Sequence, residues 1–133
     1  MMPMALALAA LAPVPAVAQS AALPGVDALR GLEKGLWEMR ERGVHGGPPV
    51  RTSCLGDPAK LLLVRHSLGQ CRLFVVQDMP DRTSVTAQCG GSGSGRSDLR
   101  VETPRLVQLD TQGVYMGAPY AMQLEGRRIG PCR

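Results

Sequence analysis

Along the second half of the chain, apolar and polar residues alternate with a period of two, the pattern of strands that bury one face. In the segment 83–89, for example, Val85 and Ala87 lie on one face and polar residues lie on the other. Proline, glycine and polar clusters separate such segments, among them a glycine- and serine-rich loop at 90–95 and a turn at 111–113. Strands are predicted at 36–42, 50–54, 71–76, 83–89, 99–103, 106–110, 114–116 and 119–125.

Two short helices are predicted in the first half of the chain. Asp27 can cap a helix over 28–34, and Asp57 with Pro58 starts a second helix that runs to about His66. The apolar run 61–64 is broad for an amphipathic stripe, so this second helix is expected to press onto a sheet. The fold class predicted is mainly β, an antiparallel meander of about seven strands that forms a curled sheet or small barrel to hide its edges.

The N-terminal segment has the features of an export signal. Residues 5–17 form an uncharged apolar run that is shorter than the roughly 20 residues needed to cross a bilayer. Ala16-Val17-Ala18 is a small-residue cleavage site, which places cleavage after Ala18. We therefore predict a signal peptide at 1–18, a flexible arm at 19–26 and one β-rich domain at 27–133, located in the periplasm.

The charge pattern argues against a nucleic-acid partner. The chain has 15 basic and 11 acidic residues, for a formal net charge of +4. Bases alternate with acids, as in Arg100-Val101-Glu102, and no basic run with interleaved aromatic residues occurs. A solvated mixed-charge face is expected, on a monomer that does not span the membrane.

Four cysteines, Cys54, Cys71, Cys89 and Cys132, follow the leader. An even number of cysteines in a short exported chain predicts disulfides, and four cysteines allow three connectivities. The favoured pairs are Cys54–Cys71, which would close the segment carrying the second helix, and Cys89–Cys132, which would tie down the C-terminus. The rival is Cys71–Cys89 across a hairpin centred on Pro80, together with Cys54–Cys132. Because the spacings contain no C-x-x-C, no metal site is predicted.

Several short motifs together resemble a known family. They are Gly35-Leu36-Trp37-Glu38, Cys54-Leu55, the single Cys71 and Cys89, the segment 100–108, and the closing Gly126-Arg127-Arg128-Ile129-Gly130-Pro131-Cys132. In this order they resemble the bacterial exported family known as domain of unknown function 3617, across essentially the whole mature chain. The resemblance implies a small periplasmic β-rich domain and supplies no catalytic residues.

The Gly-x-Trp sequence at Trp37 is also similar to the start of lipocalin-like barrels. In such barrels the tryptophan closes the floor, often beneath an arginine. Trp37 with Arg127 or Arg128 is therefore a candidate structural anchor that could form a cation–π contact.

No catalytic constellation is found, so we expect a non-enzymatic protein without a cofactor. His45 lies in a loop and His66 near a helix end, and four paired cysteines leave no thiolate for nucleophilic chemistry. The aspartates at 57, 78, 81, 98 and 110 are assigned to caps and turns. The preferred function is binding of a small apolar or amphipathic envelope ligand on an inner face formed by Val85, Ala87, Leu99, Val101, Met122 and Leu124. The alternative is a protein-binding factor, such as a periplasmic enzyme inhibitor or an envelope assembly partner.

Overall fold

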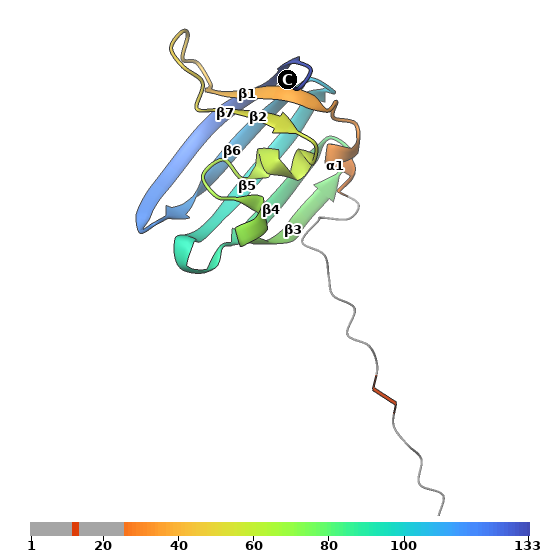
Figure 1. Cartoon of the computed structure of the whole chain (residues 1–133), viewed down its shortest axis with the longest axis vertical. Helices are drawn as coiled ribbons and strands as arrows, with labels where there is room; N and C mark the ends of the chain where they lie inside the picture. Colours follow the sequence, from red (N-terminus) through yellow and green to blue (C-terminus); the bar gives the residue numbers. More distant parts are fainter. Residues whose placement is uncertain (1–11, 14–25) are drawn as a thin grey trace, which may run out of the picture.

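A computed structural model describes residues 12–13 and 26–133, which form one antiparallel sheet of seven strands with short helical segments packed on one face (Figure 1). Apart from residues 12–13, the predicted signal peptide lies outside the described residues, and so does most of the predicted arm. None of the described helices is long and apolar enough to cross a membrane. The elements are α1 (Asp27–Arg30), β1 (Gly35–Glu41), β2 (Arg51–Leu55), η1 (Pro58–Leu62), η2 (Leu68–Gln70), β3 (Arg72–Met79), β4 (Arg82–Gln88), η3 (Gly90–Ser92), β5 (Gly93–Thr103), β6 (Leu106–Tyr115) and β7 (Ala118–Gly130), where η marks a 3₁₀ helix.

The sheet follows the predicted meander with one long-range addition. Strands β3 to β7 pair in sequence order, and β1 then pairs with β7 while β2 pairs with the far side of β1. Strand β2 is therefore one edge of the sheet, and β3 is the other. The sheet is not closed into a barrel, so of the two predicted forms the structure shows the open one.

The core lies between the inward face of the sheet and the helical segments. Trp37, Leu99, Leu109 and Leu124 from the strands are each at most 1% exposed, and Leu62 of η1 packs against them. Below the helical segments, the Ser97 hydroxyl donates to the Leu62 carbonyl at 2.6 Å, which holds η1 on the sheet. Helical segments and sheet thus form one continuous core.

The helical segments are shorter than predicted. The Asp57 side chain accepts a hydrogen bond from the Ala59 backbone at 3.0 Å, as expected of an N-cap, but η1 ends at Leu62. The Arg51 side chain of β2 then donates to the carbonyls of Leu63 and Val64, which satisfies them outside a helix. Near the N-terminus, Val26 was predicted in the flexible arm but is 4% exposed in the core.

The predicted hairpin loop at 90–95 is shorter than expected, and the predicted turn at 111–113 lies inside a strand. The 90–95 segment is a single 3₁₀ turn followed by the start of β5, and 111–113 is in the middle of β6. The β6–β7 hairpin turns instead at Met116 and Gly117, whose φ values of 50° and 81° are those that a tight type I′ turn requires. A Cβ at Gly113 would collide with the Ser94 carbonyl oxygen of β5 and would lie 2.7 Å from the hydroxyl of Tyr120, and one at Gly95 would also collide with that hydroxyl. These glycines make room for an aromatic side chain.

The disulfides are Cys54–Cys132 and Cys71–Cys89, so the favoured pairing was wrong and the rival is confirmed. Cys71 and Cys89 extend the β3–β4 hairpin by one pair beyond the Arg72–Gln88 partners. Cys54 and the chain after β7 both lie beside β1, which brings Cys54 and Cys132 to a Cα–Cα distance of 5.5 Å. The favoured Cys54–Cys71 bond fails because β2 and β3 are opposite edges of the sheet.

Candidate functional site

The predicted ligand-facing residues lie on the inward face, where other side chains cover them. Val85, Leu99 and Leu124 are between 0% and 2% exposed, and they share a cluster with Leu61 and Leu62 of η1. Val101 and Met122 pack against the rim of the same cluster, and Ala87 belongs to a neighbouring cluster beside the Cys71–Cys89 disulfide. The apolar inner face is thus occupied by this chain's own leucines.

Trp37 is a core side chain that anchors the start of β1. It is 1% exposed, and its indole N–H donates to the Glu33 carbonyl at 2.9 Å. Arg128 is its cross-strand neighbour, but the Arg128 guanidinium donates to the Lys34 carbonyl at 2.8 Å. Arg127 pairs with Glu125 instead, and the described residues contain no cation–π contact between Trp37 and either arginine.

The outward face of the sheet is polar and largely self-neutralised. Along single strands, bases pair with acids two residues away, as Arg96 does with Asp98 at 3.2 Å. Asp98 and Asp110 are direct cross-strand partners, so their prediction as turn residues was wrong. Asp110 pairs with Arg42 of the segment after β1 at 3.1 Å. Because both carboxylates have an arginine partner, this face presents a solvated network of ion pairs.

The hydrogen bonds of this network lower two carboxyl pKa values. Burial, the largest contribution, raises the pKa of Asp98, but hydrogen bonds from Arg96 and Ser84 and the Arg96 charge together bring it below its ordinary value. Hydrogen bonds from Arg127 and Gln108 lower the pKa of Glu125. Both groups are therefore ionised across the neutral range and hold their arginine partners in place.

Strand β3 is the most exposed apolar element of the sheet. It pairs only with β4, so one side of its backbone has no strand partner among the described residues. Phe74, Val75, Val76 and Met79 are 47%, 44%, 55% and 40% exposed. Natural proteins usually shorten, charge or cover such an edge, because its free N–H and C=O groups can template another strand. A long apolar edge that stays open is therefore a candidate interaction surface.

Local interactions fix the shape of this edge. The pairing with β4 shifts by one residue between Val75 and Gln77, so Val76 is a bulge on β3. The Thr83 hydroxyl donates to the Gln77 carbonyl at 2.9 Å and holds the bulge from inside. At the end of β3, the Asp78 carboxylate accepts from the Asp27 backbone at 3.1 Å, which links α1 to the edge. The bulge at Val76 and this contact at Asp78 thus fix the conformation of the second half of β3.

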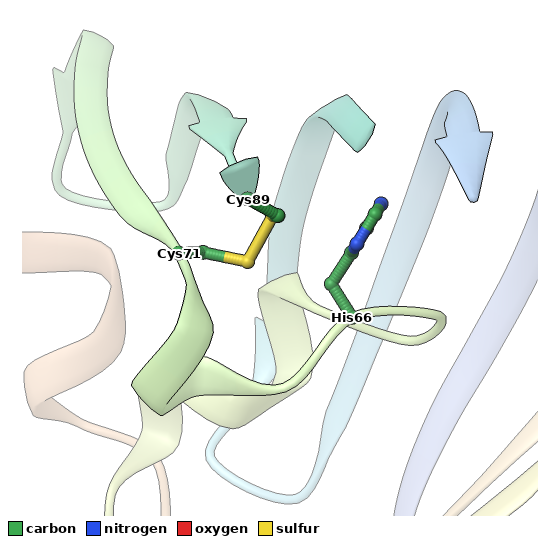
Figure 2. Close-up of side chains that lie close together, drawn as sticks. All are labelled: His66, Cys71 and Cys89. Atoms are coloured by element: carbon green, nitrogen blue, oxygen red, sulfur yellow. A yellow bond between two sulfur atoms is a disulfide. The ribbon is translucent and has the colours of Figure 1, made fainter. Parts of the chain in front are cut away.

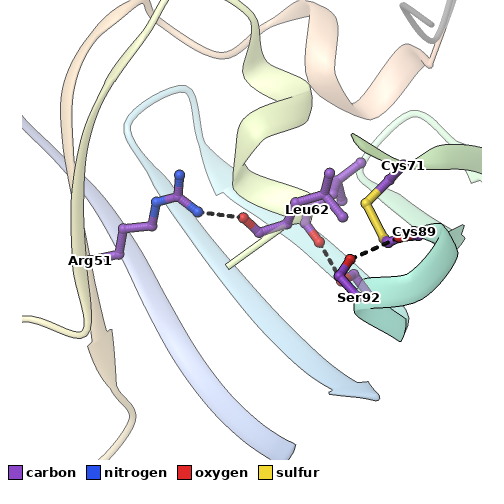
Figure 3. The surroundings of a disulfide bond; sticks show 7 residues. Arg51, Leu62, Cys71, Cys89 and Ser92 are labelled. Atoms are coloured by element: carbon purple, nitrogen blue, oxygen red, sulfur yellow. Dashed lines mark hydrogen bonds between the residues drawn. A yellow bond between two sulfur atoms is a disulfide. The ribbon is translucent and has the colours of Figure 1, made fainter. Parts of the chain in front are cut away.

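A second unusual feature lies on the inward side of the neighbouring hairpin. The imidazole of His66, which follows η1, lies beside the Cys71–Cys89 disulfide (Figure 2). Around this disulfide, the Ser92 hydroxyl donates to the Cys89 carbonyl at 2.8 Å, and Arg51 reaches in from β2 to the segment next to Leu62 (Figure 3). The disulfide and the imidazole are both enclosed by the fold.

Sequence reasoning identified β3 as a strand but could not place it at an edge. The signal that could have found it is its composition, because apolar residues run through Phe74, Val75 and Val76 without alternation. His66 is predicted near a helix end, and the structure places it after η1 as a buried side chain that is 3% exposed. Nothing in the local sequence marks this histidine as buried, since its neighbours Arg65 and Ser67 are exposed.

Two disulfides indicate an oxidising, extracytoplasmic compartment. Comparison of the chain with family models, curated proteins and solved structures found no match of any of the three kinds.

Proposed function

We propose that this protein is a periplasmic protein-binding module that takes an extended segment of another envelope protein by strand addition at β3. The observation that carries the proposal is the apolar, unpaired edge, in which Val76 is 55% exposed. In strand addition, main-chain hydrogen bonds give affinity and alternate side chains give specificity. The rival proposal, a small apolar ligand on the inner face, has less support, because Leu61 and Leu62 fill that face.

The side chains along β3 define the chemistry of the segment that fits. Arg72 lies at the start of the strand and Asp78 near its end, with Phe74, Val75 and Val76 between them. An antiparallel partner therefore has a basic residue near its start, an apolar centre and an acidic residue near its end. Opposite charges directly across two strands contribute roughly 0.2–1 kcal/mol, which is enough to select register.

The bulge at Val76 favours a foreign segment over a second copy of this chain. If two copies paired edge to edge with Arg72 opposite Asp78, the two bulges would lie close together near the centre of the new ladder. A bulge leaves its extra residue unpaired and bends its strand, so two adjacent bulges disrupt pairing more than one does. A regular extended peptide brings no bulge of its own.

A peptide titration tests this proposal. The probe is a capped fluorescent peptide that copies residues 72–79, because this sequence has the required basic start, apolar centre and acidic end. The control peptide has the arginine and the aspartate exchanged. We expect saturable binding of the first peptide, measured by fluorescence anisotropy, and weaker binding of the exchanged peptide.

Two matched variants place the binding on the molecule. Val76 and Val44 are both 55% exposed, but Val44 lies in the loop after β1. Val76→Lys puts a charge on the edge and should weaken peptide binding by at least about tenfold, because charged edge residues oppose strand addition. Val44→Lys should leave binding unchanged. Equal effects of the two substitutions, or no binding of the first peptide to the unchanged protein, would refute strand addition at β3.

A further inference from the structure

His66 is buried in a way that leaves both of its ring nitrogens without a partner. The residue is 3% exposed, and neither Nδ1 nor Nε2 has a hydrogen bond within the described part of the chain. Buried polar groups are almost always hydrogen-bonded, because losing water without compensation costs free energy. An enclosed imidazole with two unused nitrogens therefore suggests a binding function.

The groups that face His66 are sulfur atoms and aromatic rings. One nitrogen of His66 and the sulfur atoms of Cys71 and Cys89 all lie within 4.8 Å of one another, and the two cysteines are 5% and 4% exposed. Figure 2 shows the imidazole beside the disulfide on the inward side of the hairpin. The ring of Tyr115 meets the imidazole edge-on, with ring centroids 5.3 Å apart.

Gly93, at the start of β5, is a further neighbour of the imidazole. A Cβ there would make an ordinary contact with the Cε1 atom of His66 at 3.6 Å, and it is the backbone of β6 with which that Cβ would clash. The imidazole of His66 thus lies over a glycine, with the disulfide and Tyr115 as further neighbours. The ring is therefore held in place by packing rather than by hydrogen bonds.

We infer that reduction of the Cys71–Cys89 disulfide creates a zinc site whose ligands are Cys71, Cys89 and His66. Two cysteines and one histidine are a common ligand set for Zn²⁺, with a water molecule in the fourth position. Zinc–sulfur and zinc–nitrogen bonds of about 2.3 and 2.0 Å need ligand atoms about 3.5–4 Å apart. The two sulfur atoms, bonded to each other in the oxidised protein, must therefore move apart after reduction, while a nitrogen of His66 already lies within 4.8 Å of both. Two thiolates balance the charge of the ion, which suits a buried site.

The chemistry balances with a dithiol as the reductant. A dithiol gives two electrons and two protons to the Cys71–Cys89 bond and is itself oxidised to a disulfide, leaving two thiols. Binding of Zn²⁺ then releases two protons, because the ligands are thiolates. The metal would bridge the same two residues as the disulfide, so the β3–β4 hairpin is closed in both states.

Zinc binding to the full chain tests the inference. The protein is reduced with a phosphine, freed of excess reductant without oxygen, and titrated with Zn²⁺ alone while bound metal is counted by native mass spectrometry. Cobalt substitution reports ligation, because thiolate bonds to Co²⁺ give a charge-transfer absorption band. We expect one tightly bound ion per reduced chain and none in the oxidised protein. A reduced chain that is unfolded without zinc should refold when the metal binds, as followed by circular dichroism.

The two histidines give a matched pair of variants. His66→Ala should weaken zinc binding by at least about tenfold and should change the cobalt spectrum, whereas His45→Ala in an exposed loop should do neither. A Cys54→Ser, Cys132→Ser double variant should keep the site. The inference fails if the oxidised protein binds equally well, if His66→Ala binds like His45→Ala, or if the reduced chain binds no ion or stays unfolded with zinc.

Discussion

Removing the Cys54–Cys132 disulfide should cost this protein a large part of its stability. The bond joins residues 78 positions apart, β2 at one edge and the chain after β7. Both cysteines are exposed, so the double substitution to serine removes almost no packing. Its effect therefore comes mainly from the unfolded state, which becomes less constrained when the cross-link is absent.

The size of the effect follows from the length of chain that the bond closes. The Cys71–Cys89 bond lies within this loop and shortens it to an effective length of about 60 residues. The loop-closure entropy then predicts that the double substitution lowers the free energy of unfolding by about 4 kcal/mol at 25 °C. For a domain of about 110 residues, this corresponds to a fall in Tm of roughly 15–25 °C.

Urea unfolding followed by circular dichroism measures the loss of unfolding free energy. Non-reducing peptide mapping confirms both disulfides in the unchanged protein. The control is the same comparison with both proteins fully reduced, where the difference should almost vanish because the two side chains are exposed. A loss below about 1 kcal/mol in the oxidised proteins would show that the cross-link does not act through the unfolded chain in this way. A difference that persists in reductant would point to packing instead.

Two further changes test the packing and the charge network. Gly95→Ala should lower the free energy of unfolding by about 1–3 kcal/mol, because the new Cβ meets the Tyr120 hydroxyl. Combining it with Tyr120→Phe should remove most of that loss. Thermal unfolding of the two single variants and of the double variant measures this. The lowered pKa of Asp98 means that its stabilising contribution is complete above the unfolded pKa of about 3.9 and is lost as the pH falls through the lower folded value. Stability measured against pH should therefore fall less steeply in Asp98→Asn, and identical slopes would contradict this reasoning.

The alternation of apolar and polar residues predicted the strands well, because burial of one face imposes that period directly on the sequence. The prediction failed at glycines, because a glycine can either allow a turn or leave space for a neighbouring group inside a strand. Gly95 and Gly113 suggested a flexible loop and a turn, although they serve to make room for Tyr120 within two strands. The predicted strands 114–116 and 119–125 left the β6–β7 connection at 117–118, one residue after the true turn, because Met116 is unusual at a positive φ.

Features that depend on long-range topology could not be read from the sequence. The pairing of β1 with β7 decides which strands are edges, and it also brings Cys54 to Cys132, whereas Cys71 and Cys89 meet across the local β3–β4 hairpin. The inner apolar positions were identified correctly as one face, but the sequence did not show that Leu61 and Leu62 would cover them. The open edge at β3 and the enclosed His66 are consequences of these same long-range contacts.

Site-specific photo-crosslinking in the source cells tests most directly whether the β3 edge binds another protein. A benzophenone amino acid replaces Val76 in one variant and the equally exposed Val44 in the other. Strand addition at β3 predicts a discrete adduct with an envelope protein from position 76, competed by the peptide that copies residues 72–79, and no such adduct from position 44. Equal crosslinking at both positions, or none at position 76, would contradict it.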